Sequence, residues 1–187
     1  MAEIDRLIVS FMVDEVVVGF FISVPPGHVA CVYDRGRGVL NKIWGPGLHL
    51  KIPFWQVAKL FNAQTIEYGI RKGFNPKADE EILGDEPINA VTRDNRLVNV
   101  EGAILFRINK EHVTKLWENI GENFISKIVR PVSRSRIRSV IAEFTSDEVI
   151  TTKRPAVESK IRAELEDVLA EKGIIVERML LSEVKLA

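Results

Sequence analysis

The sequence predicts an α+β fold in which an antiparallel or mixed β-sheet packs against helices, preceded by an apolar segment that associates with a membrane. Short runs of alternating apolar and polar residues continue as far as Ile108, and this pattern is typical of strands. Past Asn109 the apolar period changes from two to 3.6, and residues 174–186 then return to a strand pattern. We therefore divide the chain into a membrane-associating segment, residues 1–24, and a single domain, residues 25–187.

The composition excludes two classes of protein. The chain has 187 residues, with 26 basic and 26 acidic side chains, so no overall positive field favours nucleic acid as a partner. The single cysteine, Cys31, excludes an intramolecular disulfide framework and a CxxC metal site. Because Cys31 lies in an alternating apolar run, we expect it to be a buried core thiol.

The apolar segment, residues 7–24, is balanced between insertion into a bilayer and exclusion from it. Its apolar side chains contribute about −4 to −7 kcal/mol to insertion, whereas Asp14 and Glu15 at its middle cost about +5 to +7 kcal/mol. A full span, a shallow or re-entrant insertion, and a soluble amphipathic or buried segment all stay open, with membrane contact as our expectation. A secretory signal peptide is not favoured, because acids interrupt the run and no small-residue cleavage site precedes Pro25. The side chains expected to touch lipid are Leu7, Ile8, Phe11, Val17, Phe20, Phe21 and Ile22.

Three aromatic residues beside prolines extend this expected membrane contact. Trp44, Phe54 and Trp55 lie at turns and follow the apolar segment closely in the sequence. Aromatic rings with a polar edge suit the headgroup layer of a bilayer. Ordinary packing in a protein core is the alternative interpretation of the same three residues.

The first half of the chain predicts strands separated by turns rich in glycine and proline. We expect strands at residues 28–34, 39–43, 48–52 and 58–71, the last as one long extended run. Residues 73–86 are polar and acidic, so we expect a mobile loop there, and its acids lie where a carboxyl group titrates normally.

The strand with the clearest pattern is residues 97–108. Val98, Val100, Gly102, Ile104, Phe106 and Ile108 all fall on one of its faces. Asp94-Asn95 supplies the left-handed backbone that a tight hairpin turn needs between this strand and residues 87–92. Such a one-sided strand predicts a sheet with one wet face and one face covered by helices.

Helices fill most of the second half. We expect a short helix at residues 111–119 and a longer one at residues 122–144, which Pro131 should kink or divide. Thr145-Ser146-Asp147-Glu148 fits a capping box, and Pro155 fits the first turn of a further helix that stops at Gly173. The final strand, residues 174–186, is expected to pair with the hairpin that contains residues 97–108.

No active-site constellation is present in the sequence, so we expect a protein that is not an enzyme and that holds no cofactor or metal. His28, His49 and His112 are far apart, and no nucleophile elbow, Walker motif or dinucleotide fingerprint occurs. A basic cluster lies in the long predicted helix, at Lys127, Arg130, Arg134, Arg136 and Arg138. It predicts either contact with nucleic acid or anionic lipid, or a solvated face that pairs with Glu118, Glu122 or a neighbouring subunit. We favour the solvated face, since the cluster lacks interleaved aromatic residues.

The order and spacing of several short motifs are similar to those of the SPFH (band 7) domain of prohibitins and stomatins, and closer to prohibitin-like members. In the first half these motifs are Pro26-Gly27-His28-Val29-Ala30, Asp34-Arg35-Gly36, Gly45-Pro46-Gly47-Leu48-His49, Ile52-Pro53, Thr92-Arg93-Asp94 and Val98-Asn99-Val100. In the second half they are Phe106-Arg107-Ile108, Val129-Arg130-Pro131, Ile137-Arg138-Ser139-Val140, Gly173-Ile174-Ile175-Val176-Glu177-Arg178 and Val184-Lys185-Leu186.

The resemblance implies a non-enzymatic, membrane-associated scaffold. Its partners would be the lipid bilayer, further copies of the full-length protein in a homo-oligomeric ring or cage that organises membrane microdomains, and membrane-bound AAA proteases, but no nucleic acid. The family's coiled coil would begin where this sequence stops, at Leu186-Ala187, so we expect a piece truncated before the coiled coil. The alternative function is a soluble protein- or peptide-binding module that acts through a sheet edge or the acidic loop.

Overall fold

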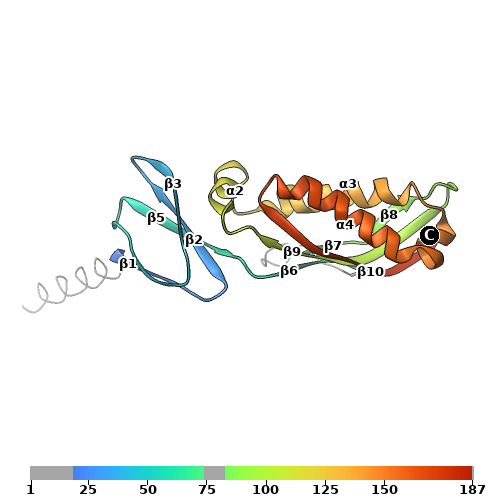
Figure 1. Cartoon of the computed structure of the whole chain (residues 1–187), viewed down its shortest axis with the longest axis horizontal. Helices are drawn as coiled ribbons and strands as arrows, with labels where there is room; N and C mark the ends of the chain where they lie inside the picture. The colour runs from blue at the N-terminus through green and yellow to red at the C-terminus, as the bar shows by residue number, and fades with distance from the viewer. Residues whose placement is uncertain (1–18, 74–82, 187) are drawn as a thin grey trace, which may run out of the picture. The chain divides into compact units, whose positions relative to one another are not determined.

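The structure is a computed structural model that describes residues 19–73 and 83–186 (Figure 1). The chain folds into two compact units, one that ends at Gln64 and one that begins at Thr65. The sequence predicted a single domain from residue 25 onward. Each unit has its own sheets.

Residues 19–64, the described part of the first unit, contain five strands. β2 (His28–Asp34) lies between β3 (Gly38–Trp44) and β5 (Gln56–Asn62) in a three-stranded antiparallel sheet. β1 (Phe21–Val24) pairs with β4 (Gly47–Leu50) in a separate two-stranded antiparallel ribbon. One core cluster consists of Val24, Ala30, Val32 and Trp44, against which Ile22, Leu40 and Ala58 pack.

The last four residues of the predicted apolar segment belong to this folded unit. Residues 21–24 form β1 instead of continuing a membrane segment. Their burial has a period of two, since Phe21 and Ser23 are exposed while Val24 is buried and Ile22 packs against the core. This alternation places one face of β1 against the core and leaves the other face outside.

The long extended run predicted at residues 58–71 is two strands in different units, so this prediction is wrong. β5 ends at Asn62, and β6 (Ile66–Ile70) begins after a short break. The Asn62 side chain accepts a hydrogen bond from the Gln64 backbone N–H at 2.9 Å, and the Ala63 N–H donates to the Gly27 carbonyl at 2.9 Å. An Asn side chain bonded two residues ahead turns the chain, which ends the strand.

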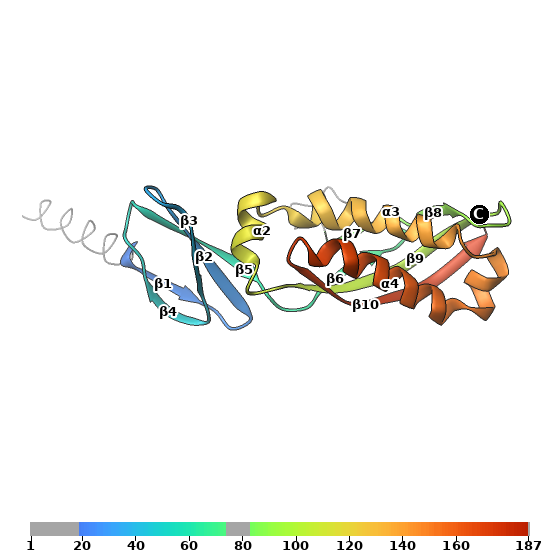
Figure 2. The ribbon, with the colours of Figure 1, turned by 45° about the horizontal axis from the view of Figure 1, so that its top comes forward.

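The second unit is a sheet with helices over one face, as the α+β prediction required (Figures 1 and 2). The strand order is β10 (Ile174–Leu186), β9 (Leu97–Ile108), β6 and β7 (Gly84–Asp85), and β8 (Ile88–Val91) also pairs with β9. The predicted pairing of the final strand with residues 97–108 is confirmed as antiparallel, with Val176 opposite Phe106. The alternating face of β9 is also confirmed, since every second residue from Val98 to Ile108 is buried.

Backbone irregularities in this unit lie where the sequence indicates them. Asn95 has φ +56° in the hairpin turn between β8 and β9. Gly102 faces a bulge of β10, where an added Cβ would lie 2.3 Å from the Leu180 carbonyl oxygen. Gly173 has φ +77° directly before β10. A side chain at Gly102 would collide with the neighbouring strand, and one at Gly173 would strain the backbone.

The helices follow the predicted order. α2 (Val113–Asn119) is short, and a π-helical turn, η1 (Ile125–Val129), leads into α3 (Arg130–Ile141) with Pro131 in its first turn. Pro131 follows shortly after this π-helical turn, and the backbone stays right-handed helical through Val129 and Arg130, so the predicted long helix changes type there without a break. A second π-helical turn, η2 (Glu148–Thr152), leads into α4 (Arg154–Ala170). Within the described ranges, no helix is long and apolar enough to span a bilayer.

Candidate membrane-contact site

Exposed large apolar side chains gather in the first unit. Of the fifteen found among the described residues, ten belong to it: Phe20, Phe21, Tyr33, Leu48, Leu50, Ile52, Phe54, Trp55, Val57 and Leu60. Leu83, Val91, Leu97, Leu180 and Leu186 are those of the second unit. Single exposed apolar residues are normal, but a set concentrated in the smaller unit marks an interaction surface.

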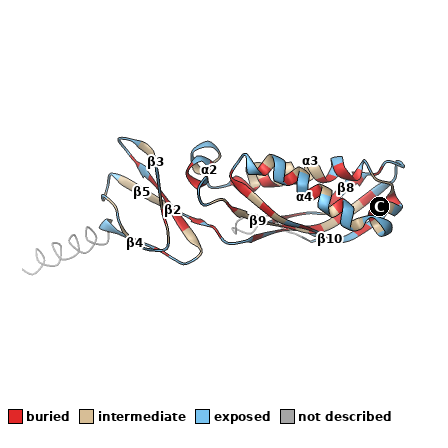
Figure 3. Ribbon diagram, in the orientation of Figure 1, coloured by how far each residue is buried: buried red, intermediate tan, exposed pale blue. Residues whose placement is uncertain are grey.

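The outer face of the β1–β4 ribbon forms the centre of this surface, and Figure 3 shows exposed residues there. Phe21 lies opposite Leu50, and Ser23 lies opposite Leu48, so all four side chains share one face. Leu48 is 68% exposed and Leu50 is 67% exposed. The ribbon therefore presents large aliphatic side chains to its surroundings while its other face serves the core.

The inner face of the ribbon explains why the outer face cannot be turned inward. His49 on this face stacks on Trp44 with ring centroids 5.1 Å apart, and its Nε2 lies 2.7 Å from the Gly45 carbonyl oxygen. Ile22, directly opposite His49, packs against the core. A one-residue shift in register would exchange the two faces and bury Phe21 and Leu50 at the expense of these contacts.

The turn after β4 adds the most exposed aromatic residue. Phe54 is 81% exposed and has φ +61°, a left-handed conformation that is costly for a bulky side chain. Hydrogen bonds on both sides hold this turn: the Trp55 N–H donates to the Pro53 carbonyl at 2.7 Å, and the Gln56 N–H donates to the Ile52 carbonyl at 2.9 Å. The surroundings therefore impose the outward position of the Phe54 ring.

Asp34 fastens this turn to the end of β2. One carboxylate oxygen accepts hydrogen bonds from the Trp55 indole N–H at 3.2 Å and from the backbone N–H groups of Gly36 and Arg37 at 3.0 and 3.1 Å. The other accepts from the Gln56 amide at 3.0 Å and the Arg37 guanidinium at 3.1 Å. The donors from Gln56 and Arg37 hold the pKa of the buried Asp34 well below its usual range.

The predicted lipid-contact residues divide into three groups. Phe20, Phe21, Phe54 and Trp55 are exposed. Ile22 packs against the core, and Trp44 is only 7% exposed within it, so core packing, the alternative interpretation, holds for Trp44. Leu7, Ile8, Phe11 and Val17 lie outside the described residues.

Six residues of this surface were not predicted from the sequence, namely Tyr33, Leu48, Leu50, Ile52, Val57 and Leu60. The signal was present, because Leu48, Leu50 and Ile52 alternate with His49 and Lys51. The alternation predicted a strand, but it did not indicate which face the core would cover.

The predicted basic cluster at residues 127–138 is engaged within the second unit. Arg130 donates to both oxygens of Asp85 at 2.9 and 3.2 Å, and Arg134 lies 3.4 Å from the same carboxylate. Arg136 pairs with Glu164 at 3.3 Å. Lys127 donates to the Ile120 carbonyl at 2.7 Å, and Arg138 donates to the Asn89 carbonyl at 3.0 Å. These contacts support the structural interpretation of the cluster over a nucleic-acid or lipid site.

Asp85 corrects the prediction of a mobile acidic loop at residues 73–86. Residues 74–82 lie outside the described residues, but Gly84 and Asp85 form β7, which pairs in parallel with β6. Asp85 is buried, and it raises the pKa of Arg130 through their hydrogen bonds. Its two arginine partners come from α3, which the sequence could not place beside residue 85.

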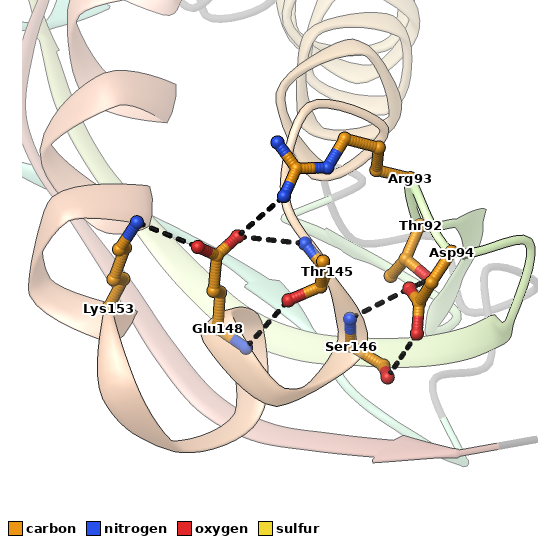
Figure 4. Close-up of polar contacts among 7 residues, drawn as sticks. All are labelled: Thr92, Arg93, Asp94, Thr145, Ser146, Glu148 and Lys153. Carbon is orange, nitrogen blue, oxygen red and sulfur yellow. Dashed lines mark hydrogen bonds and ion pairs between the residues drawn. The ribbon is translucent and has the colours of Figure 1, made fainter.

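The family motif Thr92-Arg93-Asp94 forms a joint between the β8–β9 hairpin and the start of η2 (Figure 4). Asp94 accepts hydrogen bonds from the Thr92 hydroxyl at 2.6 Å and from the Ser146 N–H and hydroxyl at 2.9 and 2.7 Å. These donors hold the pKa of Asp94 well below its usual range. The contacts close within the unit, so Asp94 serves the fold.

The predicted capping box is confirmed at the same joint. The Thr145 N–H donates to the Glu148 carboxylate at 3.0 Å, and the Glu148 N–H donates to the Thr145 hydroxyl at 3.4 Å. Lys153, 2.7 Å away, and the Thr145 N–H together lower the pKa of Glu148 to about 2.

The described residues offer no metal-binding cluster. Within residues 19–73 and 83–186, no three His, Cys, Asp or Glu side chains are placed to hold a metal ion. Cys31 is fully buried, as predicted, and burial raises the pKa of its thiol to about 12. A thiol that stays protonated is a poor nucleophile.

The fold and the site define a class: an α+β domain with a small β unit that carries an exposed apolar face. The SPFH domain / Band 7 family model matches residues 22–187, and the chain belongs to this family, in agreement with the resemblance seen in its motifs.

Its similarity to prohibitins is also confirmed by comparison with curated relatives. Prohibitin 1 of Gallus gallus is 26% identical over 155 residues, which cover 83% of this chain and 51% of that protein. Prohibitin-4, mitochondrial, of Arabidopsis thaliana is 26% identical over 140 residues, covering 75% of this chain and 44% of the relative. Prohibitin-1 of Saccharomyces cerevisiae is 25% identical over 155 residues, covering 83% and 48%. The chain spans about half the length of the curated relatives it matches.

Proposed function

We propose that this chain is a non-enzymatic, membrane-associated scaffold subunit whose first unit lies against a lipid bilayer. The exposed apolar face formed by the β1–β4 ribbon and the Phe54 turn carries this proposal. Transferring such side chains from water to an apolar medium is favourable by about 25 cal/mol for each Å² covered. The face also directly follows the apolar residues 7–18 in the sequence.

The proposal extends to assembly through the family relationship. A relative from Caenorhabditis elegans, 25% identical over 155 residues, is named mitochondrial prohibitin complex protein 1. We propose that the full-length protein likewise forms a homo-oligomeric ring or cage, that it organises membrane microdomains, and that membrane-bound AAA proteases are among its partners. Copurification from native membranes tests these partners.

Vesicle binding by the full chain tests the membrane role. We expect the double variant Leu48→Ser/Leu50→Ser to bind phospholipid vesicles at least tenfold more weakly than wild type. Each leucine that the bilayer covers contributes about 1–2 kcal/mol. The double variant Val91→Ser/Leu97→Ser is a matched control from the second unit, since these residues are 50% and 46% exposed. Co-sedimentation with vesicles measures both.

Two results would contradict the proposal. One is a wild-type chain that stays in the supernatant with every vesicle composition. The other is an equal loss of binding in the two double variants, because the apolar face of the first unit would then have no special role. Circular dichroism of each variant checks that the loss is not caused by unfolding.

The alternative function is a soluble module that binds a peptide through a sheet edge. This alternative has less support than the membrane function. β10 is the end strand of the sheet in the second unit, but side chains of α4 occupy the middle of its backbone. Glu158 accepts from the Leu181 N–H at 2.9 Å, and Arg154 donates to the carbonyls of Leu181 and Ser182. An edge covered in this way offers few backbone groups to an added strand. Saturable binding of a peptide without any lipid dependence would favour this alternative.

A further inference from the structure

We infer that the bilayer contacted by the first unit has an anionic surface. This inference rests on the proposed membrane function and specifies its lipid. The chain as a whole is balanced, with 26 basic and 26 acidic residues. Residues 19–64, the described part of the first unit, hold five basic residues, Arg35, Arg37, Lys42, Lys51 and Lys59, and a single acidic residue, Asp34, whereas residues 1–18 hold Arg6 and the acids Glu3, Asp5, Asp14 and Glu15.

The one acidic residue contributes little negative charge to the surface. Asp34 is only 1% exposed, and its two oxygens are fully engaged by the turn and by Arg37. Within residues 19–64, therefore, the charged groups that face solvent are cations. A surface that combines exposed apolar side chains with cations alone has the chemistry of a protein face for anionic lipid.

Two of the cations are tied through the backbone to the apolar face. Lys51 lies between Leu50 and Ile52, and its N–H donates to the Phe20 carbonyl at 2.8 Å. The exposed Arg35 donates its N–H to the Trp55 carbonyl at 3.1 Å. A long, flexible basic side chain next to an apolar face allows its charged end to reach lipid headgroups.

Three of the five cations are available for an external partner. Among the described residues, Arg35, Lys42 and Lys51 take part in no ion pair. The basic cluster at residues 127–138 differs, because its members are engaged by Asp85, Glu164 and backbone carbonyls. The structure thus assigns the anionic-lipid role to the first unit instead of that cluster.

The proposed partner is a bilayer whose headgroups carry net negative charge. Coulomb attraction at such a surface is worth about 1 kcal/mol for each Lys or Arg near it, which corresponds to roughly a fivefold change in partitioning. The attraction falls off within a Debye length, about 10 Å at 0.1 M salt, so raising the salt concentration weakens it. An acidic protein surface is the competing occupant and is treated as an outcome of the test.

The experiment compares the full chain on vesicles of phosphatidylcholine alone and on vesicles that also contain phosphatidylglycerol. We expect tighter binding to the mixed vesicles, with an advantage that shrinks as salt is raised. The variant Arg35→Gln/Lys51→Gln should lose about 25-fold in binding to the mixed vesicles and much less on phosphatidylcholine. The control Lys110→Gln/Lys172→Gln removes two exposed cations of the second unit and has the same net charge. It should bind within about twofold of wild type.

The outcomes separate this inference from the proposed function. Equal binding to both kinds of vesicle at every salt concentration would overturn the inference and leave the membrane function standing. Equal losses in the two double variants would also overturn it, because net charge alone would then explain the preference. No binding to either kind of vesicle would contradict the membrane function itself. Wild-type binding by Arg35→Gln/Lys51→Gln would show that these cations serve another partner, such as an acidic protein, and would overturn the inference.

Discussion

Asp34 shows how one buried carboxylate can organise an exposed surface. It collects donors from three parts of the first unit: the turn after β2, the Trp55 indole and the Gln56 side chain. With its N–H satisfied internally, the Trp55 indole can approach lipid without burying an unpaired donor. A sequence with a lone Asp at the end of an apolar strand does not reveal Trp55 and Gln56 as partners, since they lie 21 and 22 residues away.

Replacing Asp34 with Asn is expected to destabilise the first unit at neutral pH. An amide offers one acceptor oxygen in place of two and turns its NH₂ group toward the Gln56 and Arg37 donors. The melting temperature of Asp34→Asn should therefore be below that of wild type. Thermal unfolding followed by circular dichroism measures the difference.

The pH dependence of this difference follows from the lowered pKa of Asp34. A carboxyl group with a depressed pKa stabilises the fold fully above its unfolded pKa of about 3.9, and this stabilisation is lost as the pH falls toward the folded value. The gap between wild type and Asp34→Asn should be constant above about pH 5 and should narrow in acid. A gap that widens below pH 4 would contradict this role of Asp34.

We predict that the lack of a side chain at Gly36 leaves room for the Trp55 ring. An added Cβ at Gly36 would lie 3.3 Å from Cζ2 of Trp55, so Gly36→Ala should displace the indole from Asp34 at a cost below about 1 kcal/mol. The Nε1–H resonance of Trp55, assigned by its loss in Trp55→Phe, should shift. Gly45→Ala is the matched control, because nothing lies within 4 Å of its added Cβ. A resonance that shifts equally in both variants would show that Gly36 has no specific contact with the indole.

At the scale of elements, the sequence is most informative where one local signal decides the outcome. The alternation of β9 from Val98 to Ile108 and the capping box at Thr145 were both predicted correctly. Each depends on residues that are neighbours along a strand or a helical turn. The break between Asn62 and Ile66 was not predicted, because the residues on both sides have the pattern of a strand. Only their pairing with different strands, β5 with β2 and β6 with β9, shows that they are two strands.

Asp85 is the clearest case of an element that only tertiary contacts define. β7 has two residues, and no local pattern distinguishes it from the polar loop before it. Its position follows from pairing with β6 and from the charge contact with Arg130 and Arg134 of α3. The loop prediction failed here because a buried acid surrounded in sequence by other acids looks like a solvated one.

The variant Asp85→Ala is expected to lower the free energy of unfolding by about 2–3 kcal/mol. Removing one partner of a buried ion pair typically costs 3–5 kcal/mol, and this is reduced here because the side chains of Arg130 and Arg134 are about one-third exposed. Urea unfolding measures the change. Glu164→Ala is the control, since its pair with Arg136 lies at the surface and should contribute at most about 1 kcal/mol. Similar losses in the two variants would contradict a special role for Asp85.

At the scale of the whole molecule, the balanced composition hides an uneven distribution of charge. The total of 26 basic and 26 acidic residues argued against an overall positive field that would attract nucleic acid, and that argument holds only for the chain as a whole. Once the structure places a boundary after Gln64, the described part of the first unit is basic, with its one acid buried. Because residues 58–71 were predicted as one continuous strand, the boundary after Gln64 could not be recognised in the sequence. The charges of the two units were therefore not counted separately.

The division into two units predicts that vesicles protect one of them selectively. Hydrogen–deuterium exchange of the full chain should slow at residues 51–56 when phosphatidylglycerol-containing vesicles are added, because the bilayer covers the turn that carries Phe54 and Trp55. The hairpin turn at residues 93–96 is a matched reference, since it also contains a residue with positive φ, Asn95, and its four residues are exposed. Its exchange should not change. Equal slowing of exchange in both turns would mean that lipid contact is not specific to the first unit. Slower exchange at residues 93–96 alone would show that the second unit contacts the membrane.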